Sequence, residues 1–301
     1  MVAFRSYPSN KSFDFRPVIL DRPAAFSQAG QDILSTAWRD NIMKFSGPDA
    51  LPRLMVAPNG ARRTTADHPA VPVIIPDIVE NAVACHAAGA GAIHFHVRDA
   101  DQQHILDAGL YREALVALRQ AVPDMHLQIT TEAVGRYSPD QMRQLALDVM
   151  PPGISIATSE MIPDRQPSPD DVALYRTLHE AGTRTQHILY HPKDVDLLAD
   201  LVTAADLPHS AIWCLFVIGH YTGRISDPGM IAAFVAAAAA RGLDPDWAIC
   251  AFAAEENDTL VTAVAQGGKL RVGFENSLFM PDGSIAADNA SRVAAANRLF
   301  G

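Results

Sequence analysis

Short apolar runs alternate with amphipathic segments along most of the chain, beginning at Leu54. Each run ends in a polar or glycine-containing stretch, a pattern typical of buried strands separated by surface helices. The eight runs are 54–57, 92–97, 126–131, 154–157, 186–190, 211–217, 247–252 and 269–273. The helical segments are 76–88, 107–121, 138–148, 169–181, 192–205, 227–241, 256–266 and 288–299. Several of these helices open on a capping side chain followed by proline, as at Ser138-Pro139.

Eight strand-then-helix units predict an α/β fold of the (β/α)8 TIM barrel type. A doubly wound dinucleotide-binding sheet fits less well, because no GxGxxG motif opens the first helix. Residues 1–50 differ from the rest, since they are rich in aromatic residues, proline and serine and carry no strand signal. We therefore predict an N-terminal extension at 1–50 and a catalytic barrel domain at 51–301.

The composition narrows the class of protein. The chain has 301 residues, of which 49% are hydrophobic and 19% charged, as in a soluble globular protein with a large core. A net charge of −10 argues against nucleic acid as a partner. No long uncharged apolar stretch predicts a membrane span, and the N-terminus lacks the apolar core of a signal peptide, so we expect a cytoplasmic protein. Cys85, Cys214 and Cys250 lie in apolar contexts without CxxC spacing and are expected in the core.

The motif GAIHFHVRD places two histidines at the end of the second run. In a TIM barrel the residues that follow each strand line the mouth, where chemistry takes place. His94 and His96 are two positions apart, so in a strand they face the same side. Glu275, in LRVGFEN, follows the last run, and the second and last strands of a closed barrel both flank the first. Two histidines and one carboxylate suit Zn²⁺, and would also accommodate Fe²⁺ or Mn²⁺.

Each of these residues also has a simpler interpretation. One histidine could be a polar core residue and the other a surface residue, and Glu275 could be an acid at the start of a helix. Other strand ends carry hydroxyl, acidic and basic side chains that could hold a carboxylate or another small anion. They are Thr130, Thr131, Glu132, Thr158, Ser159, Glu160, Arg62, Arg98 and Arg271. Each arginine alone could instead be a surface charge or an ion-pair partner.

Three further positions are candidates of lower specificity. Glu132 would suit acid–base work if burial raises its pKa, although a salt bridge to an arginine is the alternative. His191 and His220 follow the fifth and sixth runs and could be a ligand, a base or loop residues. The loop that begins at Gly219, GHYTG, could hold a phosphate or the tail of coenzyme A on backbone donors.

The order of motifs resembles the β-keto acid cleavage enzymes, the family of 3-keto-5-aminohexanoate cleavage enzyme. The likeness covers residues 52–300 and rests on NGARRTTADHPAVP, GAIHFHVRD, QITTEAVG, FVIG and LRVGFENSLF. It implies a TIM barrel that forms a homo-oligomer, a dimer or tetramer, and that binds Zn²⁺ through the HxH pair and the glutamate of GFE. Those positions are His94, His96 and Glu275 here.

The resemblance also implies a reaction. The family condenses a β-keto acid with acetyl-CoA and splits the product into acetoacetate and a new acyl-CoA. Arg271 matches the family arginine that helps activate the reacting groups and bind the thioester, and Thr130 and Thr158 match its hydroxyl-bearing residues most nearly. We expect Arg62 and Gly219 to contact the acetyl-CoA.

This chain departs from the family pattern at three positions. Asn276 stands where the founding pattern has an aspartate that can serve as general base, and an amide cannot accept a proton at neutral pH. Arg62 and His191 stand where the family can carry glutamates that contact a substrate amino group. We therefore expect a small β-keto acid with a neutral or anionic side chain rather than one that bears an amino group. Glu132 is the candidate base in place of the missing aspartate.

Two other functions are compatible with the same residues. One is a metal-dependent C–C lyase, aldolase or hydrolase that does not use coenzyme A. The other is a non-catalytic barrel that binds a metabolite, which the missing aspartate at position 276 brings into consideration.

Overall fold

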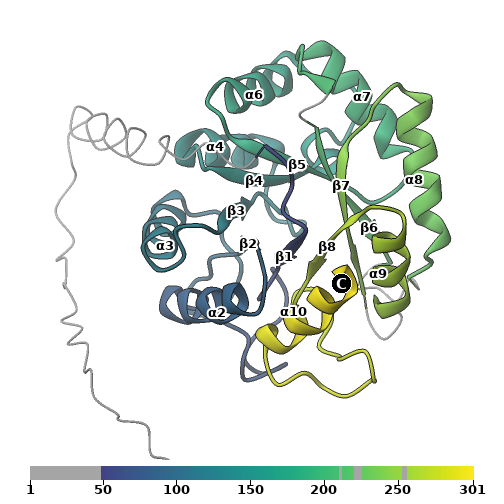
Figure 1. The fold of residues 1–301 in the computed structure, drawn as a ribbon. Coiled ribbons are helices and arrows are strands. Elements are labelled where there is room, and N and C mark those ends of the chain that lie inside the picture. The colour runs from purple at the N-terminus through teal and green to yellow at the C-terminus, as the bar shows by residue number, and fades with distance from the viewer. Residues whose placement is uncertain (1–48, 210–211, 220–225, 253–255) are drawn as a thin grey trace, which may run out of the picture. The chain divides into compact units, whose positions relative to one another are not determined.

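Parallel strands close into an eight-stranded barrel in the computed structural model, which describes residues 49–209, 212–219, 226–252 and 256–301 (Figure 1). Each strand pairs with its neighbour in sequence, and the first pairs with the last in the register Leu54↔Leu270. The strands are β1 (Leu54–Val56), β2 (Ala92–His94), β3 (His126–Thr130), β4 (Gly153–Ala157), β5 (Arg184–Leu189), β6 (Trp213–Ile218), β7 (Asp246–Ala251) and β8 (Lys269–Val272). The predicted TIM barrel is confirmed.

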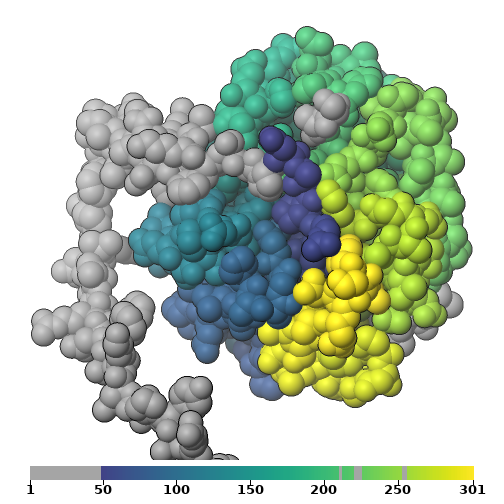
Figure 2. All heavy atoms as spheres, viewed as in Figure 1, coloured from purple at the N-terminus to yellow at the C-terminus, as the bar shows by residue number. Residues whose placement is uncertain are grey.

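Helices surround the strands (Figure 1), and in the space-filling view the segments follow one another around the molecule in chain order, from blue through green to yellow (Figure 2). They are α2 (Ile75–Ala87), α3 (Ala108–Ala121), α4 (Pro139–Val149), α5 (Thr158–Met161), α6 (Pro169–Glu180), α7 (Asp194–Ala204), α8 (Gly229–Ala240), α9 (Glu256–Ala265), α10 (Asn289–Asn297) and the 3-10 helix η2 (Arg298–Phe300). Ser138 and Ser168 cap the starts of α4 and α6, as their Ser-Pro pairs predict, and Gln141 and Asp171 complete a capping box at each start.

Two short elements differ from the prediction. The run 92–97 was expected to be strand throughout, but β2 ends at His94. Beyond it Phe95 still donates its N–H to the Gln128 carbonyl of β3, whereas the pairing with β1 has ended at Ile93. The strand end at Thr158 is instead the first residue of α5, which follows β4 without a loop and is too short to show helical periodicity.

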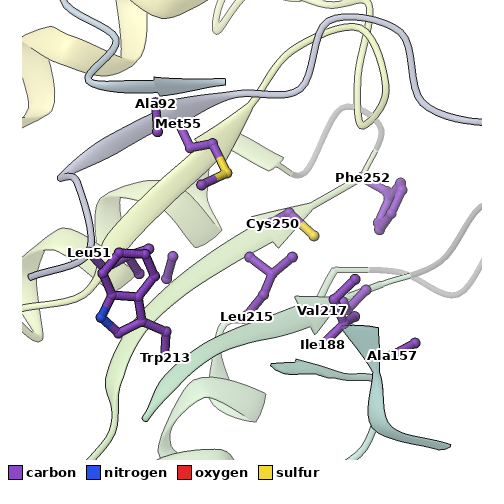
Figure 3. Packing of buried hydrophobic residues seen from close by; sticks show 11 residues of the cluster. Leu51, Met55, Ala92, Ala157, Ile188, Trp213, Leu215, Val217, Cys250 and Phe252 are labelled. Carbon is purple, nitrogen blue, oxygen red and sulfur yellow. The ribbon is translucent and has the colours of Figure 1, made fainter. Parts of the chain in front are cut away.

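The barrel interior is apolar on one side and polar on the other. Its apolar cluster includes Met55, Leu215 and Cys250, and Figure 3 shows these side chains gathered between the strands. At the N-terminal end, Leu51 joins this cluster and donates its backbone N–H to Asp246. The strands β2 to β5 contribute polar side chains that are at most 1% exposed: His94, Gln128, Ser155 and Gln186. This polar side leads toward the predicted metal ligands.

The structure also bears on the predictions for the cysteines, for membrane-spanning helices and for the N-terminal extension. The three cysteines are buried and free, as expected. No helix in the described part of the chain is both long and apolar enough to cross a bilayer. The predicted extension at 1–50 lies almost entirely outside the described residues, as do His220 and most of the loop after Gly219. The domain boundary therefore stays a prediction.

Acid is expected to destabilise the barrel through two buried histidines far from the predicted ligands in sequence. Burial, aided by Arg119 and Arg184, lowers the pKa of His126 to about 3, and burial lowers that of His187 to about 4. In the unfolded chain both imidazoles have a pKa near 6.5, so below this pH the unfolded state binds protons that the folded state does not bind. The unfolding free energy therefore has its full value above pH 6.5 and decreases as the pH falls. At pH 5 each ring has lowered it by about 2 kcal/mol.

Urea unfolding of the wild type and of His187→Phe at pH 7.5 and pH 5 measures this effect. Phenylalanine keeps the stacking of position 187 on Tyr175 but cannot titrate. The variant should lose less stability than the wild type on acidification, by about 2 kcal/mol. Equal losses in the two proteins would show that His187 is not a source of the acid sensitivity.

Candidate metal centre and active site

Three potential metal ligands meet at the C-terminal ends of β2 and β8. His94 is the last residue of β2, His96 lies two residues later, and Glu275 lies just past β8. One ligand atom from each lies within 4.8 Å of the others, and the three residues are 1%, 0% and 5% exposed. The expectation from sequence that strand ends from β2 and β8 converge across β1 is thus met.

The distances between these atoms suit a single metal ion. Nε2 of His94 lies 3.1 Å from Nε2 of His96, and Oε2 of Glu275 lies 3.4 Å and 3.5 Å from the two nitrogens. Tetrahedral zinc with bonds of 2.0–2.1 Å separates neighbouring ligand atoms by about 3.3 Å. Oε2 of Glu275 is buried and has no hydrogen-bond partner among the described residues. The three atoms therefore form one face of a tetrahedral site.

His96 is held beyond the end of β2 by a side chain that replaces a strand. Oδ1 of Asn59 accepts from the backbone N–H of His96 at 3.2 Å, and Nδ2 of Asn59 donates to the His96 carbonyl at 2.9 Å. Asn59 is fully buried in the loop after β1. The amide thus continues the ladder where β1 has stopped, which keeps His96 on the same face as His94.

Glu275 is placed by a turn that only glycine permits. Gly273 has φ +136°, and a Cβ at this position would overlap the backbone carbonyl of Ala57. The close approach lets Glu275 donate its N–H to that same carbonyl at 3.0 Å. On either side, Phe274 donates its N–H to Asn289 at 2.7 Å and accepts from Arg63. The motif RVGFE is therefore fastened against the loop after β1.

Gly60 is expected to be needed for the carboxylate position rather than for the fold. Its φ is +61°, and an added Cβ would overlap Cγ of Glu275. Gly242, with φ +68° and nothing within 4 Å, is a matched control for the backbone strain. Gly60→Ala and Gly242→Ala should each lower the unfolding free energy by about 1 kcal/mol, but only Gly60→Ala should weaken zinc binding. Calorimetric zinc titration measures this, and equal affinity in both variants would contradict it.

Charges around the three ligands favour their metal-binding forms. Burial opposes ionisation of Glu275, but Arg271, His94 and His96 outweigh it and hold the pKa of that carboxyl below its usual range. Nη2 of Arg271 donates to Oε1 of Glu275 at 3.0 Å, which leaves Oε2 directed at the histidines. Burial lowers the pKa of His94 to about 4 and that of His96 well below its usual value, despite the attraction of Glu275. Neutral imidazoles beside a carboxylate are the forms that bind a divalent cation.

Both imidazole rings use their other nitrogen for a hydrogen bond on the outer side. Nδ1 of His94 lies 2.9 Å from Oε1 of Gln128, and Nδ1 of His96 lies 3.3 Å from Nδ1 of His104. Nε2 of His104 lies 3.1 Å from the backbone carbonyl of Glu132. His104 was not predicted from the sequence; a turn at 99–103 brings it back against His96. The turn-forming residues DADQ are the only signal that could have found it.

Glu132 lies at the edge of the metal centre. Its Oε2 is 3.9 Å from Nε2 of His96. Burial, reinforced by Glu275 and Glu160, raises the pKa of Glu132 to about 8, although Arg62 and Arg271 oppose the shift. The hydroxyl of Thr130 accepts from the backbone N–H of Glu132 at 3.1 Å. A raised pKa is the condition under which the sequence made Glu132 a candidate for acid–base work, and Thr130 helps to orient this residue.

Two other predicted residues present buried polar atoms without hydrogen-bond partners among the described residues. These are the hydroxyl of Thr158 and both amide atoms of Asn276, on residues that are fully buried. Buried polar groups in folded proteins are nearly always paired, so such atoms mark positions where a ligand can bond. Thr158 immediately follows β4, and Asn276 immediately follows Glu275.

The predicted basic residues separate into different roles. Arg98 was expected to help hold an anion, but its guanidinium donates to backbone carbonyls of Asn59, Gly60, Ala61, Arg63 and Gln102. It therefore fixes the loop after β1. Arg62 is exposed at the mouth, and its charge opposes the rise that burial causes in the pKa of both Glu132 and Glu160. His191 is exposed and accepts from the Lys193 N–H, as a loop histidine does. Gly219 directly follows β6 and is the last residue that the structure describes before the gap at 220–225.

Comparisons with known proteins agree with the motif order. A sequence model for the family described as beta-keto acid cleavage enzyme matches residues 53–301. The 3-keto-5-aminohexanoate cleavage enzyme of Fusobacterium nucleatum is 24% identical over 246 residues, covering 80% of this chain and 88% of that protein. The 3-oxoadipate:acetyl-CoA acetyltransferase of Cupriavidus necator is 25% identical over 244 residues, with coverages of 80% and 85%.

More distant similarity extends to a third relative and to solved structures. The 3,5-dioxohexanoate:acetyl-CoA acetone transferase of Paraburkholderia graminis is 24% identical over 279 residues, covering 79% of this chain and 86% of that protein. The binary complex of ObcA with oxaloacetate superposes with a TM-score of 0.61 at 16% identity. It aligns with 76% of this chain, which spans only 63% of ObcA, so the likeness concerns the barrel fold alone.

Proposed function

The chain belongs to the β-keto acid cleavage enzyme family, and on this basis we propose that it is a zinc-dependent transferase acting on a small anionic β-keto acid and acetyl-CoA. The products would be acetoacetate and a new acyl-CoA. One observation carries the proposal: His94, His96 and Glu275 direct three ligand atoms at one point in the barrel mouth. Relatives named as acetyl-CoA transferases of keto acids support the choice of co-substrate.

The protonation and hydrogen bonding of His94, His96 and Glu275 suit the binding of a divalent cation. Each imidazole has its Nδ1 engaged on the outer side, so the two Nε2 atoms and the unpartnered Oε2 of Glu275 converge without a proton donor between them. Two histidines and a carboxylate with an open fourth position are typical of catalytic zinc. When bound, the ion would act as a Lewis acid on the substrate ketone.

The net reaction can be written with balanced bonds. The C2 methylene of a β-keto acid loses a proton, and the resulting enolate attacks the thioester carbonyl of acetyl-CoA with release of the CoA thiolate. The thiolate then attacks the original ketone carbon, and the bond between that carbon and C2 breaks. The acyl group leaves as acyl-CoA, and the C2 enolate takes back a proton to become acetoacetate.

Side chains of this site are suited to those steps. Glu132, oriented by Thr130 and lying beside His96, is proposed to move the C2 proton. Arg271 keeps Glu275 ionised and is proposed to bind the thioester oxygen. Thr158 and Asn276 offer buried hydrogen-bonding atoms to substrate oxygens. Asn276 can donate through its amide but cannot serve as the base.

The substrate side chain is proposed to be neutral or anionic. Arg62 at the mouth and His191 beyond β5 replace acids that would attract an amino group. An arginine favours carboxylates through paired, charge-assisted hydrogen bonds. Arg62 and Gly219 are also the proposed contacts for acetyl-CoA. Assembly into a homo-oligomer stays a prediction.

A substrate panel tests the function. Zinc-loaded protein is incubated with β-keto acids whose side chains are neutral, carry a second carboxylate or carry an amino group. Each acid is tested with and without acetyl-CoA, and acetoacetate and acyl-CoA are measured. We expect both products only with acetyl-CoA, and highest activity with a neutral or dicarboxylic acid. Cleavage without acetyl-CoA would identify a lyase or hydrolase instead. Stoichiometric zinc without turnover of any substrate would identify a non-catalytic binding barrel.

A further inference from the structure

Two glutamines lie inside the barrel on its polar side. Gln128 on β3 and Gln186 on β5 are both fully buried. An apolar cluster that includes Met55 and Leu215 fills another part of the interior (Figure 3). An amide removed from water without hydrogen bonds costs about 1–3 kcal/mol or more, and leucine would fill such positions without that penalty. The hydrogen bonds of these amides therefore need an explanation beyond packing.

The hydrogen bonds form a chain that starts at a backbone carbonyl. Nε2 of Gln186 donates to the carbonyl of Cys214 on β6 at 3.4 Å. This carbonyl can only accept, so it fixes which end of the Gln186 amide faces it. Oε1 of Gln186 then faces Gln128 and accepts from its Nε2 at 3.2 Å.

The chain ends on a metal ligand. Because Nε2 of Gln128 donates to Gln186, its Oε1 faces Nδ1 of His94, at 2.9 Å. An amide oxygen accepts and cannot donate, so Nδ1 of His94 must carry the ring proton. The hydroxyl of Ser155, 3.4 Å from the same nitrogen, can accept as well and does not oppose this arrangement.

The opposite tautomer would disable the site. With the proton on Nε2, His94 would donate toward Oε2 of Glu275, 3.4 Å away, and would present no lone pair to a cation. That arrangement is electrostatically favourable in the absence of metal, so something must oppose it. The orientation of both amides supplies this opposition, since each has one donor end and one acceptor end.

We propose that Gln128 and Gln186 are positioning residues: they relay the direction of the Cys214 carbonyl across the barrel and set the tautomer of His94. Neither glutamine touches the point where the three ligand atoms converge. The relay gives both buried amides a function inside the barrel. Its effect on metal affinity rests on the proposed zinc site, whereas its effect on the tautomer does not.

Nitrogen-15 NMR of histidine-labelled, metal-free protein reads the tautomer directly. The His94 signals are assigned by their loss in His94→Asn. We expect the Nδ1–H form in the wild type and the Nε2–H form in Gln128→Met. Gln186→Met should give a mixture, because the freed amide of Gln128 can turn its donor toward His94. Gln128→Glu, whose carboxylate only accepts, should restore the Nδ1–H form.

Zinc affinity, measured by chelator competition, is the second measurement. Loss of an outer partner of a metal ligand weakens binding by about 10–100-fold, which we expect for Gln128→Met, with a smaller loss for Gln186→Met. His187→Phe is the matched control, because it changes a buried side chain next to Gln186 that stacks on Tyr175. It should alter neither the tautomer nor the affinity.

Two results would overturn the relay. One is a His94 ring that keeps its proton on Nδ1 in both methionine variants. The other is an equal shift in His187→Phe, which would indicate general loosening of the barrel. Should Gln128→Met fail to fold, Gln186→Met and Gln128→Glu carry the same comparison. A wild type that binds no zinc would refute the metal centre, while the tautomer measurement would still decide the relay.

Discussion

Replacing His96 by alanine is expected to abolish zinc binding and to lower kcat by at least about 1,000-fold. His96 supplies one of three ligand atoms, and His94 and Glu275 alone cannot hold a catalytic ion against dialysis. Lewis-acid stabilisation contributes several kcal/mol to such reactions, and each 1.36 kcal/mol corresponds to about a tenfold rate change. Metal analysis after dialysis and steady-state kinetics measure the two effects.

The fold should survive this substitution. His96 is fully buried with its ring against His104, so truncation leaves a cavity that costs about 3 kcal/mol. His126→Ala is the matched control, since it removes another buried ring, at the start of β3 and away from the three ligands. It should lose similar thermal stability but keep zinc and activity. Stoichiometric zinc in His96→Ala would refute the ligand assignment.

Replacing Glu132 by glutamine is expected to lower kcat by about 100- to 10,000-fold, the range for loss of a general acid–base group. Glutamine keeps the size of the side chain but cannot move a proton. Zinc content should stay near one per chain, because Glu132 is 3.9 Å from His96 and is not one of the three converging ligands. Kinetics and metal analysis of the same preparation separate these effects.

Two further variants sharpen that result. Glu160→Gln removes a neighbouring carboxylate that binds the Ala133 N–H, and it should lower kcat by no more than about tenfold. Asn276→Asp added to Glu132→Gln places an acid where the family can have one, and it should restore part of the lost rate. If Glu132→Gln alone keeps nearly full activity, Glu132 is not the base.

The barrel was predictable because its signals are local and repeated. Each apolar run lies close to a strand and each amphipathic segment close to a helix, and the eightfold alternation leaves few alternative folds. The juxtaposition of His94, His96 and Glu275 followed from two rules: alternate residues share a face, and β2 and β8 both flank β1.

Contacts that depend on side-chain direction across the barrel were not predictable. Gln128 and Gln186 belong to strands that are not neighbours, so their hydrogen bond has no sequence spacing to reveal it. His104 reaches His96 only because the chain turns back, and Arg98 points at the carbonyls of its own surroundings rather than into the mouth. A strand-end rule identifies which residues are near the mouth but not which way they face.

The fate of the acetyl carbon tests the central claim most directly. The wild-type enzyme is incubated with zinc, an unlabelled β-keto acid and acetyl-CoA carrying carbon-13 at the acetyl carbonyl, and acetoacetate is analysed by NMR. Transfer of the acetyl group onto C2 predicts label at C3 of acetoacetate and none at C1, with one unlabelled acyl-CoA formed per acetoacetate. Unlabelled acetoacetate, or acyl-CoA carrying the label, would contradict the proposed carbon transfer.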